Sequence, residues 1–92
     1  MGKVTILVPP PLRRFVGGAA RVPAEATTVR EAVDAFTARS ESLRGHLFDE
    51  SNGLRRFVRV FVDGQPSTLR PGNDIPVKDG AEVTILLALA GG

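Results

Sequence analysis

The segment that decides the fold is VTILLAL at residues 83–89. It is nearly continuous in apolar residues, which predicts a strand that is buried on both faces. The other end of the chain supplies a second strand, KVTILV at residues 3–8, in which Val4, Ile6 and Val8 share one face. The two strands lie too far apart in sequence to form a hairpin. We therefore expect them to pair in parallel at the centre of a sheet.

Further strands are indicated between these two. The prolines at 9–11 end the first strand, and a short strand is expected at 19–22, so that the two form a hairpin with a long loop. The segment FVRVFV at 57–62 is a third strand, and the Asp-Gly pair at 63–64 predicts a tight turn after it. Residues 66–76 are mostly turn and loop, with room for one short strand.

One main helix is expected before the third strand. Thr28 and Glu31 fit a capping box, in which a hydroxyl and a carboxylate accept hydrogen bonds from the first backbone N–H groups. Gly45 is a plausible end of the helix. The apolar stripe of this helix consists of Val29, Ala32, Val33, Phe36, Ser40 and Leu43. The element order predicts an α+β fold of the β-grasp type, a mixed sheet of four to five strands with the helix on one face.

Composition sets further bounds. The 92 residues allow one small domain over 1–92, with a flexible tail expected from about residue 88. Of the charged residues, 12 are basic and 10 are acidic, and the resulting net charge of +2 gives only weak attraction to nucleic acid. The chain contains no cysteine, which excludes disulfides and thiolate chemistry. No segment suits a membrane span or a secretory signal, so a cytoplasmic location is expected.

No catalytic constellation is found in the sequence. There is no phosphate-binding glycine loop, and none of the serines lies in a nucleophile-elbow motif. His46 is interpreted as a surface or helix-end residue, and the adjacent acids Asp49 and Glu50 as solvated loop residues. A single histidine also argues against a zinc site. We therefore expect neither an enzyme nor a resident metal or cofactor.

The chemically informative feature follows the last strand, where the sequence continues into Gly91 and Gly92. Glycines lack a Cβ atom, so such a tail can thread a channel that is too narrow for other residues. Its reactive group would be the carboxylate of Gly92, which an enzyme's active site could reach.

At this point the sequence resembles a known family, the ThiS/MoaD sulfur carrier proteins, which are ubiquitin-like β-grasp domains ending in Gly-Gly. The matching motifs are VFVDG at 60–64, DGAEVTI at 79–85 and ALAGG at 88–92. The RFV motif at 56–58 is similar to that of the actinobacterial carriers of cysteine biosynthesis. The sequence departs from the molybdopterin-type relatives at residues 87–88, where many of them have prolines.

The resemblance implies a two-step activation of Gly92, with Gly91 giving access to it. An adenylating partner related to ubiquitin-activating enzymes would use ATP and magnesium to form an acyl-adenylate. A sulfur donor would then displace AMP and leave a thiocarboxylate. A sulfur-accepting synthase would receive the sulfur for cysteine, thiamine thiazole, molybdopterin, thiolated tRNA or a natural product such as a thiosugar.

Partner enzymes need a docking surface on the carrier. Because side chains alternate along a strand, Thr84 and several larger side chains lie on the face of the sheet that the helix does not cover, which we call the open face. An arginine flanked by aromatic residues is typical of an interface hot spot. The expected partner-binding residues are Phe57, Arg59, Phe61 and Leu86, together with Ala88, Leu89 and Ala90 of the tail. The alternative is that the loop at 9–15 covers Phe57 and Phe61. The carrier is expected to be a monomer alone and to form hetero-complexes with its partners.

Two other functions remain open. A ubiquitin-like modifier, joined to lysines of other proteins through Gly92, would use the same activation chemistry. An RNA-binding module is a remote alternative, suggested by RFVRVFV at 56–62, because bases stack on sheet aromatics. The single expected helix, the absence of aromatics from the first strand and the low net charge argue against it.

Overall fold

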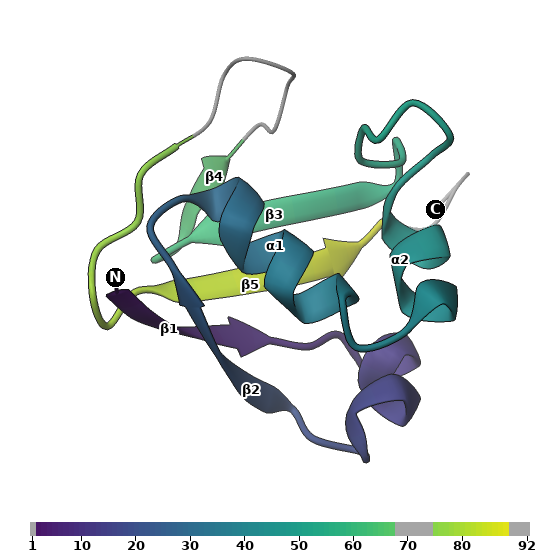
Figure 1. Ribbon diagram of the computed structural model, residues 1–92, viewed down its shortest axis with the longest axis horizontal. Coiled ribbons are helices and arrows are strands. Elements are labelled where there is room, and N and C mark those ends of the chain that lie inside the picture. Colours follow the sequence, from purple (N-terminus) through teal and green to yellow (C-terminus); the bar gives the residue numbers. More distant parts are fainter. Residues whose placement is uncertain (1, 68–74, 89–92) are drawn as a thin grey trace.

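A five-stranded sheet organises the part of the chain that this computed structural model describes, residues 2–67 and 75–88. From one edge to the other the strands are β2 (Arg21–Ala26), β1 (Gly2–Leu7), β5 (Glu82–Leu87), β3 (Val58–Val62) and β4 (Gln65–Ser67) (Figure 1). β1 and β5 are parallel, whereas the other neighbouring pairs are antiparallel. The predicted central pairing of the first and last strands is therefore confirmed.

The second strand lies further along the chain than predicted. β2 occupies 21–26 in place of 19–22, and its full length pairs with β1, from Leu7 opposite Arg21 to Gly2 opposite Ala26. Val22 and Ala26 point into the core, which fixes the alternation over this longer segment. Pro23 lies within this strand and is tolerated there, because β2 is an edge strand.

Two helices, α1 (Val29–Thr37) and α2 (Glu41–Leu47), replace the single helix that the sequence predicts. α1 begins as expected, since Thr28 Oγ1 accepts a hydrogen bond from the Glu31 N–H at 3.1 Å. The Glu31 carboxylate accepts from the N–H and the hydroxyl of Thr27, at 2.8 and 2.7 Å, one residue earlier than in a standard capping box.

The break between the helices occurs at a residue that had been assigned to the apolar stripe. Ser40 is the N-cap of α2, and its hydroxyl accepts from the Leu43 N–H at 3.3 Å. A serine favours a cap over a helix interior because its side chain competes for backbone hydrogen bonds. Gly45 does not end a helix, because it lies within α2, between the fully buried side chains of Leu43 and Leu47.

A 3₁₀-helix, η1 (Pro10–Val16), forms where only a loop was expected. The prolines have a backbone φ angle suited to a helical start and lose no internal hydrogen bond at the first positions. Leu12 anchors η1 in the core, and Gly17, with a φ of 66°, ends it in the left-handed conformation.

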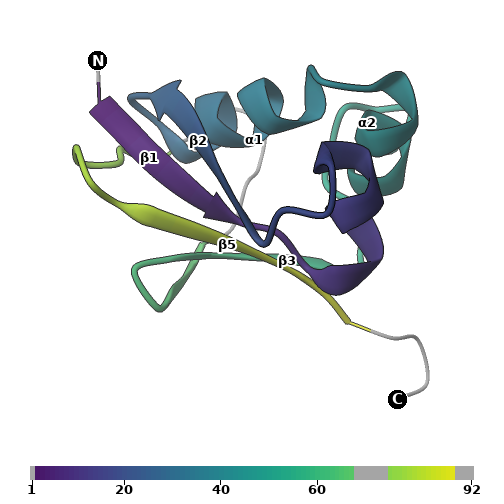
Figure 2. The same cartoon turned by 90° about the horizontal axis from the view of Figure 1, so that it is seen from below.

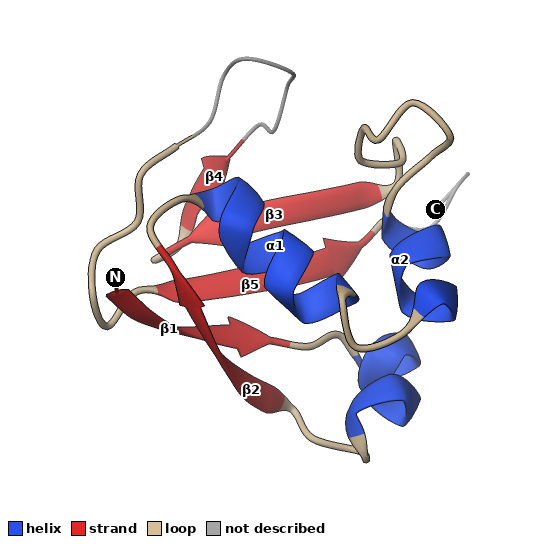
Figure 3. Ribbon diagram, in the orientation of Figure 1, coloured by secondary structure: helices blue, strands red, loops and turns tan. Residues whose placement is uncertain are grey.

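α1 and α2 lie on the same side of the sheet (Figures 2 and 3). Between the helices and the sheet lies a core that includes Val4, Ile6, Val33, Phe36, Leu43, Val60, Val83 and Ile85. In residues 2–67 and 75–88, no helix is long and apolar enough to cross a membrane.

The predicted turn at 63–64 connects β3 to β4. Asp63 and Gly64 both have positive φ values, 49° and 84°, as a type I′ hairpin turn requires. β4 thus supplies the short strand that the sequence left open, with Gln65 opposite Val62 and Ser67 opposite Val60.

Candidate functional site

β3 and β5 present two chemically different faces. Val58 and Val60 of β3, with Val83 and Ile85 of β5, are at most 5% exposed and face the helices. Side chains at the intervening positions belong to the opposite face, where Leu86 is 46% exposed. The predicted alternation is confirmed for these residues, and the helices leave the opposite face of the sheet uncovered (Figure 2).

Part of this face is an apolar groove of about 500 Å³ beside the end of β5. The residues that line it are Pro9, Pro10, Pro11, Phe57, Leu86, Leu87 and Ala88. The alternative in which the loop at 9–15 covers Phe57 is wrong, because the prolines form one wall of the groove and leave 36% of Phe57 exposed. We call this surface the apolar groove.

Arg59 and Phe61 lie on the β3–β4 side of the open face. Arg59 is opposite Leu86 in the β3–β5 ladder, and its guanidinium donates hydrogen bonds to the backbone carbonyls of Arg56 and Val58. Phe61 is half-buried and lines a second recess of about 310 Å³. The structure thus brings Phe57 and Leu86 together in one groove and places Phe61 in a neighbouring recess.

The described part of the chain ends at Ala88. Its N–H donates to the carbonyl of Phe57 at 2.7 Å, so the β3–β5 ladder continues one residue beyond β5. Ala88 is exposed and lines the apolar groove. The other predicted tail residues, Leu89, Ala90, Gly91 and Gly92, lie outside the described residues.

Several residues of this surface were not predicted from the sequence. Pro9–Pro11 were interpreted only as a strand end, although a run of prolines also offers a rigid apolar surface. Arg55 and Arg56 line the second recess with Arg59, and the signal for them was the cluster of basic residues that directly precedes β3. Leu87 was treated as part of the strand and not as part of a groove.

The polar residues considered for chemistry have local structural contacts. His46 lies in the last turn of α2, with Nδ1 2.7 Å from the Ser42 carbonyl oxygen and its ring 5.2 Å from that of Phe15. Asp49 accepts hydrogen bonds from the N–H groups of Ser51 and Gly53, and therefore shapes its own loop. Within residues 2–67 and 75–88, no group of three or more His, Asp and Glu side chains could hold a metal ion.

The mixed sheet with a central parallel pair, the helices on one side and the uncovered opposite face define a ubiquitin-like β-grasp protein. The chain belongs to the ThiS family, whose model matches residues 6–92. As a member of this family of sulfur carrier proteins, it is a carrier and not an enzyme. The fold and the family that the sequence predicts are thus both confirmed.

Individual relatives agree with this assignment. The sulfur carrier protein CysO of Mycobacterium tuberculosis is 33% identical over 91 residues, which are 97% of this chain and 98% of the relative. A chain in the crystal structure of the Amycolatopsis orientalis BexX/CysO complex is 37% identical, with a TM-score of 0.82 and coverage of 97% of this chain and 99% of that one. Small archaeal modifier protein 1 of Haloferax volcanii, 20% identical with a TM-score of 0.82 over 99% of this chain and all of its own, shares the fold.

Proposed function

We propose that this carrier holds sulfur as a thiocarboxylate at Gly92. In the first step, the Gly92 carboxylate attacks the α-phosphorus of ATP in a partner enzyme, pyrophosphate leaves and an acyl-adenylate forms. Magnesium bound by that partner offsets the phosphate charge. In the second step, hydrosulfide attacks the carbonyl carbon, AMP leaves and the sulfur loses its proton. The resulting thiocarboxylate gives its sulfur to a second enzyme.

The observation that carries this proposal is the family match, which runs through Gly91 and Gly92. The absence of cysteine from the chain supports it, since no side-chain thiol competes as the sulfur site. Gly91 adds a second residue without a Cβ atom, which suits entry into a narrow active site. In this role the chain needs no cofactor of its own, because ATP and magnesium belong to the activating partner.

We further propose that partners dock on the open face of the sheet. The docking residues are Phe57, Arg59, Phe61 and Leu86, followed by Ala88, Leu89 and Ala90 along the tail. The groove supports this role because its exposed apolar side chains lie where the chain leaves the sheet, so one partner could hold the domain and the tail together. The A. orientalis complex, in which a carrier of this family is bound to another protein, supports a hetero-complex.

The test is an intact-mass measurement of the carrier after incubation with ATP, a sulfide source and extract of the host cells. The expected result is a mass rise equal to the difference between sulfur and oxygen, which fragmentation assigns to Gly92. A variant without Gly92 is the matched control and should stay unchanged. A ladder of covalent conjugates in place of the thiocarboxylate would favour the protein-modifier alternative. An unchanged mass, with an activating enzyme shown to be present, would contradict both.

A further inference from the structure

Three arginines gather at the second recess, which is lined by residues from both faces of β3. Arg55, Arg56 and Arg59 all line this recess of about 310 Å³. In residues 2–67 and 75–88, none of the three forms an ion pair with a carboxylate. Three like charges within five consecutive positions repel one another, so this arrangement costs free energy in the isolated carrier.

Three other arginines in the described part of the chain are compensated by carboxylates. Arg21 pairs with Glu82 at 3.0 Å, while Arg30 and Arg44 share Asp34 at 3.5 and 3.2 Å. Arg55 also lines a separate depression together with acidic residues, which include Asp49 and Glu50, but it forms no ion pair with them. The recess is therefore a local excess of positive charge.

Two of the three side chains are held in place. The Arg55 Nε–H donates to the carbonyl oxygen of Gly45 at 2.8 Å, and Arg59 donates to the carbonyl of Arg56. A carbonyl oxygen orients a guanidinium without neutralising it, and each guanidinium keeps further N–H donors. Donors fixed in this way lose little conformational entropy when a carboxylate binds them.

The recess also contains apolar surface, contributed by Leu54, Phe61 and Pro66. It neighbours the apolar groove, because Arg59 of the recess lies opposite Leu86, which lines that groove. We propose that the partner protein bound to the open face inserts an acidic segment carrying an apolar side chain into this recess. The arginines would bind its carboxylates, and Phe61 would contact its apolar residue. This inference rests on the proposed function, because it assumes that partners dock on the open face.

The first experiment uses a short synthetic peptide of glutamates around one phenylalanine and records the backbone amide shifts of the ¹⁵N-labelled carrier. Shifts are expected at residues 54–61 and at Ser67, with affinity falling as salt is added. Arg56→Glu should weaken binding about tenfold, because a like charge then faces the peptide. No hydrogen bond or ion pair involves the Arg56 side chain in the described structure, so this variant should fold.

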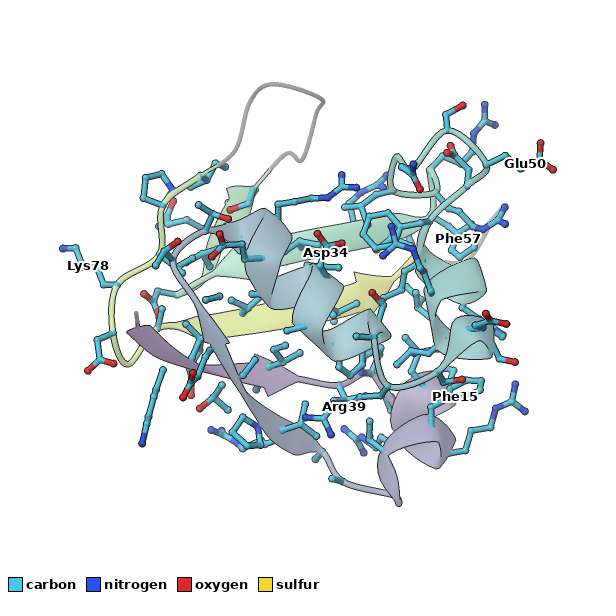
Figure 4. All side chains as sticks on the ribbon, in the orientation of Figure 1. Phe15, Asp34, Arg39, Glu50, Phe57 and Lys78 are labelled. Carbon is cyan, nitrogen blue, oxygen red and sulfur yellow. The ribbon has the colours of Figure 1, made fainter. Side chains whose placement is uncertain are left out.

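Arg39→Glu is the matched control. Arg39 is also an exposed arginine that donates only to a backbone carbonyl, that of Pro23 at 3.2 Å, and it lies far from Phe57 (Figure 4). Its reversal changes the net charge equally and should leave affinity unchanged. Equal losses in both variants, shifts away from the recess, or equal binding of a peptide with glutamines in place of glutamates would each overturn the proposal.

A second measurement separates this inference from the proposed function. The rate of sulfur loading is compared for the wild type, Arg56→Glu and Arg39→Glu at limiting carrier concentration. Failure of the wild type to gain sulfur would contradict the proposed function, whereas the peptide result would still decide whether the recess binds acidic chains. Normal loading of the wild type and equal loading of Arg56→Glu would overturn the acidic-segment proposal alone.

Discussion

Replacement of Phe57 by alanine should separate partner binding from folding. The exposed 36% of this side chain is the part that a partner can cover. An aromatic side chain carries about 200 Å² of surface, so about 70 Å² is available. At ~25 cal/mol per Å² this area contributes about 2 kcal/mol, which corresponds to about a 30-fold weaker Kd for the activating enzyme in Phe57→Ala.

The assay is sulfur loading at increasing carrier concentration, which yields the KM for the carrier together with kcat. The main effect should be on KM, because Phe57 contacts the partner and not the reacting carboxyl group. Thermal unfolding checks that the variant is folded.

Phe15→Ala is the matched control for this substitution. Phe15 is a half-buried aromatic residue of η1, with its ring beside His46 and under the guanidinium of Arg14, and it does not line the apolar groove. Its truncation removes the same atoms and should leave KM unchanged. A folded Phe57→Ala variant with the KM of the wild type would refute the reasoning that the groove binds the partner.

Four further variants test the tail and the fold. Deletion of Gly92, or addition of one residue after it, should abolish sulfur loading and leave Tm within about 2 °C of the wild type, since terminal residues usually contribute little to stability; a large fall in Tm would assign the tail a structural role. Thr28→Ala removes the cap of α1 and should cost about 1 kcal/mol, which lowers Tm by roughly 4–8 °C in a scanning calorimeter; an unchanged Tm would mean that the cap contributes nothing. Phe36→Ala empties a fully buried position and should cost about 3–5 kcal/mol in urea unfolding; a loss below about 1 kcal/mol would contradict the packing described for α1.

Local patterns in the sequence predicted the features that depend on short-range chemistry. The hydroxyl of Thr28 caps α1, and Asp63-Gly64 forms the turn after β3, as predicted. Few other local structures suit these residues. The alternation of β3 and β5 was predictable because a one-residue slip would expose the whole valine face. Even the parallel pairing of β1 and β5 followed from their separation in sequence.

The incorrect predictions concern residue types that occur in two kinds of structural position, such as serine within a helix or at its N-cap. Ser40 fits the helical spacing of an apolar stripe, and only the tertiary packing of Leu43 and Leu47 shows that it begins a new helix. The spacing of these two leucines was the available signal, and it was outweighed by Gly45. The apolar groove was not predictable, because it joins η1 to the end of β5 and therefore depends on the completed sheet.

The position of β5 between β1 and β3 has a consequence for biosynthesis. Residues 82–84 at the far end of the chain must reach residues 5–7 before the centre of the sheet exists. Contacts of such long range make folding slow and postpone it until residues 82–84 have left the ribosome. A truncated chain that lacks this segment cannot complete its core. Only chains that have been translated as far as β5, the strand that precedes the tail, can therefore fold.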